Sequence, residues 1–347
     1  MDRRGLLRQH IDIETARVLE IGALAVPLVA PHEARVEYVD HLDTEGLRRE
    51  YRGHPGVDVD KLVDVTYVWN GGTFAEAVGA AEPFDAIVSS HVFEHFPNPV
   101  QWLADAYSLL APGGQIYMVV PDMRFTFDRH RAKTRTADWI EWYLEKPSRP
   151  STGQVYDYHS KVVDVPPGYG WAQEPAGGFA NIYDPSTALE QARSAFETGR
   201  YIDAHCSVFT PVSLLALFRE IDDLNLFPFD VTAVYPTEVD DIEFALVLKR
   251  SDVPPRPQLS REIDQQLAQE AGYTGDFGAG GFAAALAADP ELQKRHNALK
   301  RQWAAEAIRN RKRAALPELD PTRHDAFPPR DDPRLARRTT WFQRLRR

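Results

Sequence analysis

The stretch PFDAIVSSHVFEHFPNPVQWLADAYSLLAPGGQIYMVVPD, residues Pro83 to Asp122, decides the fold of this 347-residue chain. It opens with a short apolar strand at Asp85 to Ser89, continues through a polar break and an amphipathic helix, and closes with a nearly all-apolar strand at Ile116 to Val120. Such a run is typical of a strand that is covered on both faces. Strand, helix and strand with a short return predict a parallel pair with a right-handed crossover.

The helix of this unit has clear boundary signals. Asn98 is a good N-cap and Pro99 suits the first helical position, where the missing N–H would be unpaired anyway. Apolar residues then recur at helical spacing at Val100, Leu103, Ala104, Tyr107 and Leu110. We therefore expect a helix that begins at Pro99, buries one face and ends before Pro112-Gly113-Gly114.

Three further regions of the chain predict the remaining strands. Arg17 to Ile21 precedes Gly22, Arg35 to Val39 ends at Asp40, and Val63 to Trp69 ends at Asn70-Gly71-Gly72. The segment between Gly22 and Val36 is short and contains two prolines, so the usual crossover helix must be short, distorted or missing there. Two late strands, Phe229 to Tyr235 and Ile242 to Lys249, are expected to form an antiparallel edge.

The rest of the chain divides into a domain and an extension. Prolines and glycines recur between Lys146 and Asp203, with one clear helix at Ser186 to Gly199, which indicates a lid or substrate-binding insertion. From Ser251 the chain is polar, with helical segments near Ser260 to Ala271 and Pro290 to Arg313 and an Arg-rich end. We predict a domain at 1–250 with an insertion at about 146–205, and a helical, partly disordered extension at 251–347.

Composition narrows the classes of function. The formal net charge of −11 argues against nucleic acid as a partner. Cys206 is the single cysteine, so neither an intramolecular disulfide nor a cysteine-rich zinc site is possible. The beginning of the chain has no apolar signal-like run, and no segment reaches the roughly 18 apolar residues of a membrane span, so a cytoplasmic protein is expected. The Arg-rich end leaves a peripheral contact with anionic lipid open.

The motifs together resemble class I S-adenosylmethionine-dependent methyltransferases, in particular type 11-like methyltransferase domains associated with sugar and polysaccharide pathways. The matching stretches are LEIG at Leu19 to Gly22, YVDH at Tyr38 to His41, FDAIVSSHVFEHFPNP at Phe84 to Pro99, LLAPGGQIYMVVPDMRFTFD at Leu109 to Asp128, and DAHCSVFTP at Asp203 to Pro211. The resemblance implies an α/β fold with a Rossmann-like, doubly wound, mostly parallel seven-stranded sheet whose last pair is reversed.

The resemblance also implies S-adenosylmethionine as the cofactor. It places Glu20 and Gly22 near the methionine moiety, Asp40 near the ribose, Asn70 near the adenine, and Ser90 and His91 near the reactive methyl, with Ser89 as a further cofactor-binding residue. The sequence departs from the family's glycine-rich loop after the first strand, because Leu24 and Val26 occupy two glycine positions. Either the loop is a family variant of altered shape or the site has decayed, and we favour the variant.

Methyl transfer from a sulfonium needs orientation, plus a base if the acceptor is a hydroxyl. His91, His95, Asp122 and His205 are the candidate catalytic residues, since each is expected near the edge of the sheet where ligands bind. Aromatic residues of the insertion either stack on a sugar or anchor the loop: Tyr156, Tyr158, Trp171 and Tyr183. No metal site is predicted, because Asp157, His159, Asp203 and His205 lack a compact spacing.

The leading hypothesis is therefore methylation of a small-molecule or glycan hydroxyl. The alternative is a methyltransferase-like module without catalysis that serves as a binding partner in a surface-polysaccharide pathway. An enzyme of the same fold that uses another nucleotide-like ligand is the third possibility. Binding of S-adenosylmethionine separates the first from the others.

Overall fold

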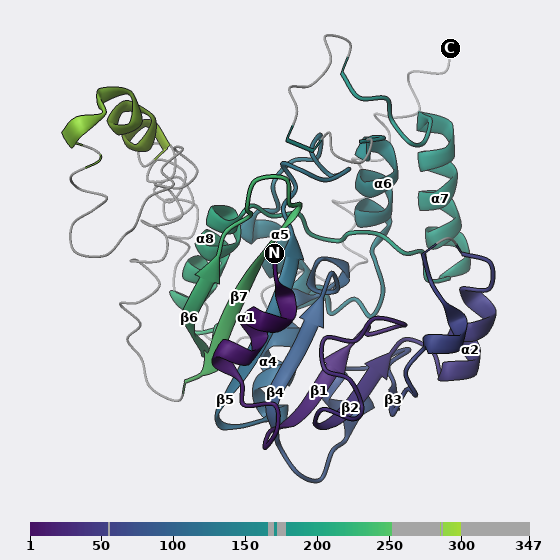
Figure 1. The fold of residues 1–347 in the computed structure, drawn as a ribbon. Coiled ribbons are helices and arrows are strands. Elements are labelled where there is room, and N and C mark those ends of the chain that lie inside the picture. The colour runs from purple at the N-terminus through teal and green to yellow at the C-terminus, as the bar shows by residue number, and fades with distance from the viewer. Residues whose placement is uncertain (55, 166–169, 172–177, 252–284, 286, 300–347) are drawn as a thin grey trace, which may run out of the picture. The chain divides into compact units, whose positions relative to one another are not determined.

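The computed structural model describes residues 1–54, 56–165, 170–171, 178–251, 285 and 287–299. It divides into two units, Met1–Ala283 and Ala284–Arg347, of which the first contains the sheet (Figure 1). In the second unit, residues 290–299 are helical, as part of the predicted Pro290 to Arg313 segment. The predicted helix at Ser260 to Ala271 and the Arg-rich end lie outside the described residues.

Seven strands form one sheet in the described part of the chain. The strand order is β3-β2-β1-β4-β5-β7-β6, parallel from β3 to β5 and antiparallel for the pairs β5–β7 and β7–β6. The strands are β1 Arg17–Ile21, β2 Arg35–Asp40, β3 Tyr67–Val68, β4 Phe84–Ser90, β5 Leu110–Pro121, β6 Phe229–Tyr235 and β7 Glu243–Arg250. This order confirms the predicted Rossmann-like α/β fold with a reversed last pair, and places the topological switch point between β1 and β4.

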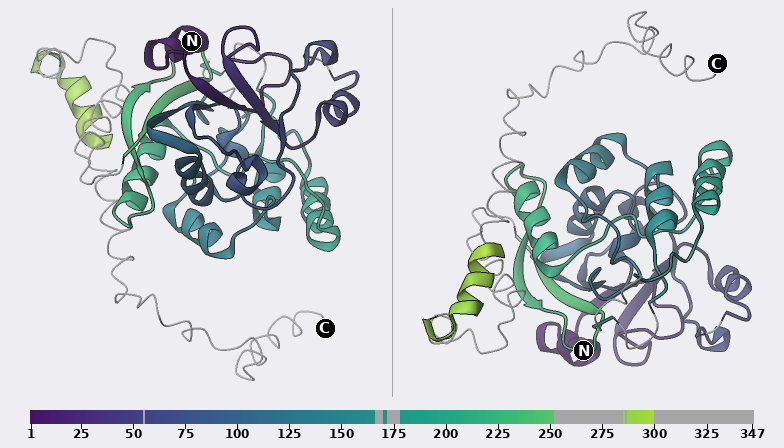
Figure 2. Two further views of the ribbon diagram at one scale, coloured as in Figure 1. Left: turned by 90° about the horizontal axis from the view of Figure 1, so that it is seen from below. Right: turned by 90° about the horizontal axis from the view of Figure 1, so that it is seen from above.

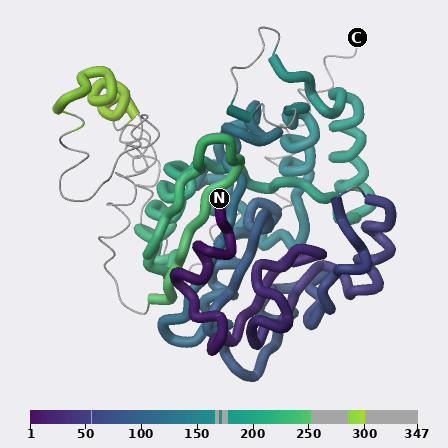
Figure 3. The backbone as a smooth tube through the Cα atoms, viewed as in Figure 1, coloured from purple at the N-terminus to yellow at the C-terminus, as the bar shows by residue number. Residues whose placement is uncertain are grey.

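The two faces of the sheet are covered by different elements (Figure 2). The N-terminal helix α1, Arg3–His10, packs Leu7 against a cluster that includes Val18 of β1 and Val88 of β4. The segment before β1 is polar in sequence and carries no predicted element, yet Asp2 caps this helix and Leu7 is fully buried. The N-terminal amine forms an ion pair with Asp241 just before β7. Figure 3 follows the path of the backbone from this terminus through the sheet.

The opposite face carries an aromatic core. Helices α4 Pro99–Leu109, α5 Thr136–Glu145 and α8 Pro211–Asp222 pack there, and α5 contacts both of the others. The ring of Phe93 contacts the rings of Trp102, Trp139 and Phe218, and all four side chains are buried. Burial of aromatic side chains of this size stabilises the helix layer by several kcal/mol in total.

The central βαβ unit follows its sequence signals. The Asn98 side chain accepts a hydrogen bond from the Gln101 N–H at 3.1 Å, and Pro99 is the first helical residue, as predicted. The buried face differs in one position, because Ala104 is exposed whereas Trp102 and Ala106 are buried. The helix ends at Leu109, and Pro112 to Gly114 lie within the long strand β5.

The chain between β1 and β2 confirms the predicted lack of a regular crossover, because this fully described segment forms turns and contains no helix. Strand β3 is shorter than predicted, with Tyr67–Val68 in place of Val63 to Trp69. The short helices α2 Thr44–Glu50 and α3 Phe74–Val78 flank it, together with a 3-10 turn at Val59–Lys61.

The insertion contains more helix than predicted. Helix α7, Pro185–Thr198, matches the expected segment, but α6, Thr152–Lys161, was missed. A capping box between Ser151 and Gln154 starts α6, and this Ser-x-x-Gln pattern is a signal that could have found it. Helices α6 and α7 pack against each other beyond the carboxyl edge of the sheet (Figure 1).

Candidate functional site

The loop after β1 is held in place by a buried carboxylate. The Glu20 side chain is 3% exposed, and its two oxygens accept hydrogen bonds from the backbone N–H groups of Leu28 and Val29 at 2.6 and 2.9 Å. Burial raises the pKa of Glu20 to about 7, although the two backbone donors oppose the shift. Because both oxygens accept hydrogen bonds from the loop, Glu20 holds the conformation of the segment between β1 and β2.

The same loop keeps a left-handed backbone at two of its glycine positions. Gly22 has φ +66°, and a Cβ there would lie 2.8 Å from Cγ2 of Val92. Leu24 has φ +46°, a conformation that costs a residue with a side chain about 1–2 kcal/mol. The predicted change of loop shape therefore leaves this feature intact, since Leu24 adopts the backbone conformation that glycine normally supplies.

Asp40 and Asn70 lie at the ends of β2 and β3, as the register of these parallel strands requires. Oδ1 of Asp40 accepts hydrogen bonds from the backbone N–H of His41 and from its Nδ1, both at 2.7 Å. Asn70 is exposed in the turn before α3. Both side chains lie at the ligand edge, which fits the cofactor roles that the family resemblance implies for them.

Ser89 and Ser90 end β4 directly beside β1. Ser89 pairs in register with Ile21 and is fully buried. Neither serine hydroxyl has a hydrogen-bond partner among the described residues, although buried hydroxyls are normally paired. The unpaired hydroxyls lie beside β1 at the switch point of the sheet, the place where ligands bind in sheets of this kind.

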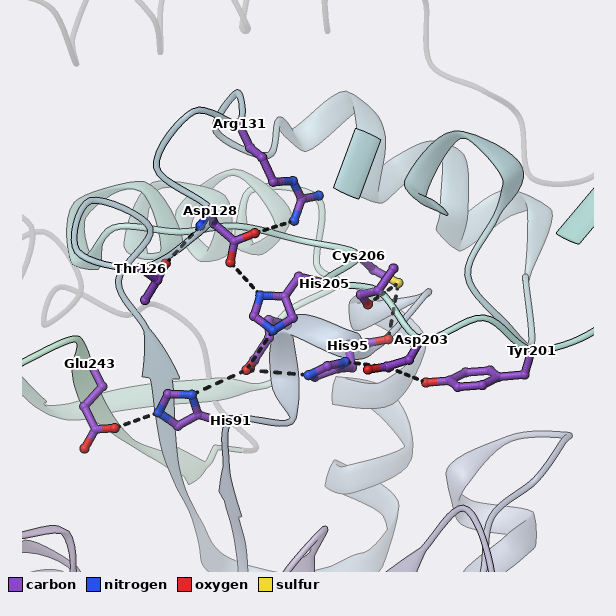
Figure 4. A network of polar contacts seen from close by, with 12 residues as sticks. His91, His95, Thr126, Asp128, Arg131, Tyr201, Asp203, His205, Cys206 and Glu243 are labelled. Carbon is purple, nitrogen blue, oxygen red and sulfur yellow. Dashed lines mark hydrogen bonds and ion pairs between the residues drawn. The ribbon is translucent and has the colours of Figure 1, made fainter. Parts of the chain in front are cut away.

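A cluster of three histidines surrounds one glutamate just past β4 (Figure 4). Glu94, in the 3-10 turn Phe93–His95, is fully buried, and no described residue donates a hydrogen bond to either of its oxygens. Oε1 of Glu94 lies 3.9 Å from a nitrogen of each imidazole. The histidine cluster comprises His91, Glu94, His95 and His205.

A carboxylate holds the other nitrogen of each imidazole. His91 Nε2 lies 2.6 Å from Glu243, His95 Nδ1 lies 2.9 Å from Asp203, and His205 Nδ1 lies 2.6 Å from Asp128. Since an ionised carboxylate can only accept, each of these nitrogens carries a proton. In the neutral imidazoles, the nitrogens that face Glu94 are therefore hydrogen-bond acceptors.

The carboxylates are themselves supported by cations and a phenol. Arg3 forms an ion pair with Glu243, and Arg131 forms one with Asp128 at 2.9 Å. The Tyr201 hydroxyl donates a hydrogen bond to Asp203 at 2.9 Å. Burial opposes ionisation of Glu243, but the hydrogen bonds from His91 and Arg3 lower its pKa to about 2. Burial likewise opposes protonation of His95, yet the hydrogen bond with Asp203 raises the pKa of His95 to about 9. These contacts fix the orientation of the rings.

His91 has a strained backbone with φ +54°. A non-glycine residue in this region costs about 1–2 kcal/mol, so the surrounding structure must over-determine it. Its N–H donates to the Val119 carbonyl at 2.9 Å, and Val92 beside it touches the Gly22 loop. The strain therefore brings an imidazole beside the end of the cofactor loop.

The histidine cluster lines a pocket of about 310 Å³. Phe125 and Phe127 form an apolar wall of the same pocket, and Ile242 lies on the side of β7. The pocket lies outside the carboxyl ends of β4 and β5, where ligands bind in sheets of this kind. A cluster of titratable groups in an apolar concavity is a candidate binding and catalytic site.

Asp122 differs from the other candidate catalytic residues. It is fully buried after β5, where Oδ2 accepts from Arg124 at 2.6 Å and from Thr237 at 2.8 Å. It does not line the pocket. The structure thus brings together His91, His95 and His205, and gives Asp122 a role in holding the turn after β5.

Several residues of the cluster were missed in the sequence. Glu94 and Asp128 are not among the candidate catalytic residues of the sequence analysis, although both side chains are buried, Asp128 to 1% exposure. Glu243 carried no signal of its own, because only the register of β5 and β7 brings it to Pro121. The adjacent Glu94 and His95, with His91 one helical turn away, were the signal that could have found the cluster.

The aromatic residues of the insertion mostly contact protein. Trp171 stacks on Phe125 with ring centroids 3.9 Å apart, and its indole N–H donates to the Asp241 carbonyl at 2.6 Å. Tyr158 lies in ring contact with His205, whereas the side chain of Tyr156 is 44% exposed. These contacts favour an anchoring role for Trp171 and a supporting role for Tyr158 beside the cluster.

A family profile described as a methyltransferase domain matches residues 14–222, which is more than half of the chain. The chain belongs to the methyltransferase-domain family. The matched range of this methyltransferase-domain chain contains the loop between β1 and β2 and all of the histidine cluster. Its limits also include the insertion and α8.

Solved structures show remote similarity to this methyltransferase-domain chain. A putative S-adenosylmethionine-dependent methyltransferase from Listeria monocytogenes is 12% identical, covers 72% of this chain and 98% of its own, and has a TM-score of 0.37. The CcbJ methyltransferase from Streptomyces caelestis is also 12% identical, with 72% and 94% covered and a TM-score of 0.37. The match to the CurJ carbon methyltransferase, 12% identical with a TM-score of 0.33, covers 71% of this chain and 51% of that protein.

This chain thus spans about half the length of the CurJ structure. No curated protein sequence matches the chain. Among the described residues, no helix is both long and apolar enough to cross a membrane.

Proposed function

We propose that this protein transfers a methyl group from S-adenosylmethionine to a hydroxyl of a small molecule or glycan. One observation carries the proposal: the cofactor loop and the histidine cluster meet at the switch point of the sheet. Gly22 of the loop faces Val92, which lies between His91 and the buried turn that contains Glu94. A methyl donor held by the loop would point its sulfonium toward the histidine pocket.

His91 is the base in this proposal. Its Nε2–H donates to Glu243, so the neutral ring presents Nδ1 as an acceptor toward the pocket. The carboxylate fixes the tautomer and stabilises the imidazolium that forms, as in other carboxylate–histidine pairs. The acceptor oxygen attacks the methyl carbon, the carbon–sulfur electron pair leaves with sulfur, and the hydroxyl proton passes to Nδ1 of His91.

The pocket suits an acceptor with both polar and apolar parts. Its imidazoles and Glu94 can recognise hydroxyls, and Phe125 and Phe127 offer aromatic faces of the kind that pack against a sugar ring or an aromatic ring. These features support a hydroxylated ring as the acceptor.

The test is methyl transfer from labelled S-adenosylmethionine to a panel of sugars and phenols, followed by mass spectrometry of the products. His91→Gln should lower kcat by about 100-fold or more, because it removes the base but keeps the size of the side chain. The exposed His32→Gln is the matched control and should leave kcat unchanged. Equal turnover of wild type and His91→Gln would contradict the assignment of the base.

The competing function is a binding module without catalysis, and the observation in its favour is the replacement of loop glycines by Leu24 and by Val26, whose side chain is 76% exposed. Such a module would bind an acceptor in the pocket without binding S-adenosylmethionine. Binding of an acceptor by a folded protein that does not bind the cofactor would favour the module.

A further inference from the structure

The described protein groups leave the Glu94 carboxylate without a hydrogen-bond partner. The carboxylate is fully buried, and neither oxygen accepts a hydrogen bond from a described residue. A buried, unpaired carboxylate is among the most unfavourable groups in a protein, and it normally neutralises, pairs with a cation or coordinates a metal. Its charge is therefore compensated either by protons on the imidazoles 3.9 Å away or by a metal ion that takes their place.

The neighbouring imidazoles do not supply hydrogen bonds to it. Nε2 of His95 and Nε2 of His205 lie 3.9 Å from Oε1 of Glu94, beyond the range of a hydrogen bond. Nδ1 of both rings is already engaged by Asp203 and Asp128. A bound metal ion displaces the proton from Nε2 of a ligating imidazole, so in the metal-bound form the two Nε2 lone pairs and the Glu94 oxygen converge on one ion.

A metal ion can bind these three ligand atoms at once, because it displaces the proton from Nε2 of each ligating imidazole and offsets the charge of Glu94. Nδ1 of His91 lies 3.9 Å from the same Glu94 oxygen.

The spacing suits a single ion. The three ligand atoms of Glu94, His95 and His205 lie within 4.8 Å of one another. Three ligands at about 2.1 Å from one ion lie about 3.4–3.6 Å apart in tetrahedral or trigonal geometry, so a contraction of at most about 1.4 Å closes the site. Side-chain rotations of this size are small compared with the distance between rotamers.

Asp203 and Asp128 accept the Nδ1–H hydrogen bonds of His95 and His205, an arrangement that is common for histidines that bind metals. Ligating imidazoles commonly donate their other N–H to a carboxylate, which fixes the tautomer and raises the basicity of the ligand. Asp203 and Asp128 do this for the two histidines, and Tyr201 and Arg131 hold the carboxylates in turn. The site thus has both a set of ligands and the support around it.

We propose that Glu94, His95 and His205 bind one divalent transition-metal ion, whose open positions face the pocket and take the acceptor hydroxyl. Two imidazoles and a carboxylate favour ions such as Zn²⁺, Mn²⁺ or Fe²⁺ over Mg²⁺ and Ca²⁺, which prefer oxygen ligands. Three protein ligands leave room for water or substrate in the coordination sphere.

The role toward the acceptor rests on the proposed function, whereas the binding of the ion does not. A hydroxyl bound to the ion would lose its proton more readily, and Nδ1 of His91, near the same Glu94 oxygen, would accept that proton. His91 is therefore kept as the base and not as a ligand.

The experiment uses the full, untagged chain after treatment with a chelator. Titration calorimetry with ZnCl₂, MnCl₂ and MgCl₂ is followed by metal analysis of the dialysed protein. We expect one Zn²⁺ or Mn²⁺ per chain and much weaker binding of Mg²⁺. Glu94→Gln and His205→Gln should each weaken binding by about 100-fold or more, and Asp203→Asn, which leaves all ligands in place, by about 10-fold.

His32→Gln is the control for incidental binding by exposed histidines, and it should leave affinity and stoichiometry unchanged. Circular dichroism checks that each variant is folded, and Asp203→Asn keeps the test decisive if Glu94→Gln does not fold. Equal affinity of wild type, Glu94→Gln and Asp203→Asn, or no bound ion in the folded wild type, would overturn the proposal. Since the titrations contain no S-adenosylmethionine, loss of cofactor binding with retained metal binding would instead count against the proposed function alone.

Discussion

Replacement of Glu20 by Gln tests how the loop after β1 is held. The Glu20 carboxylate is 3% exposed, and burial raises its pKa from an ordinary value of 4.5 to about 7. Between these two values the folded state binds a proton that the unfolded state releases, so the free energy of unfolding falls as the pH rises. Above about pH 7 both states are ionised at this group and its contribution no longer changes.

The size of the effect follows from the two pKa values. Each unit between 4.5 and about 7 corresponds to about 1.4 kcal/mol, which gives about 3 kcal/mol for the full range. Glutamine does not titrate, so Glu20→Gln lacks this dependence. We expect the free energy of unfolding of wild type minus that of the variant to fall by about 3 kcal/mol between pH 4.5 and pH 8.

The assay is urea denaturation at a series of pH values, followed by circular dichroism for both proteins. All other titrating groups are shared, so they cancel in the difference. A difference that is the same at pH 4.5 and pH 8 would refute the buried position of Glu20, and a difference that rises with pH would mean that the backbone donors lower its pKa instead.

Three further substitutions test other parts of the account. Gly22→Ala should lower the free energy of unfolding by about 1–3 kcal/mol, because φ is +66° and the new Cβ would meet Val92. Adding Val92→Ala to this variant should recover part of the loss. Equal stability of wild type, the single variant and the double variant would contradict the contact. Asp40→Ala should raise the Kd for S-adenosylmethionine by more than about tenfold if the carboxylate holds the ribose, and calorimetry would remove that assignment if the Kd is unchanged. Asp122→Asn should lower the free energy of unfolding by about 2 kcal/mol in urea titrations, with kcat unchanged; a fall in kcat of tenfold or more in a folded variant would restore Asp122 to the reaction.

The sequence predicted the sheet well because its signals are local. The caps at Asn98 and Pro99, the apolar run in β5 and the acid at the end of β2 each act within a few residues. Misassignments arose where tertiary contacts decide, as for α1, which is polar in sequence yet buries Leu7 against β1 and β4. The shortening of β3 has a similar origin, since only two residue pairs join it to β2.

The candidate site was predictable only in part for the same reason. His91 and His95 follow β4 directly, so their place at the ligand edge could be read from the chain. His205 joins them from a segment 111 residues beyond Glu94, to which it is tied by the 3.0 Å hydrogen bond from Ser207 N–H to the Glu94 carbonyl. Partners such as Glu243 and Asp128 depend on strand register and on the turn after β5, which local patterns do not encode.

Calorimetric titration of the folded, full-length protein with S-adenosylmethionine and S-adenosylhomocysteine tests the central claim most directly. We expect both compounds to bind with a stoichiometry of one, Gly22→Ala and Asp40→Ala to weaken the binding of both, and His91→Gln to bind both as wild type does. Absence of binding by either compound to the folded wild-type protein would contradict the claim.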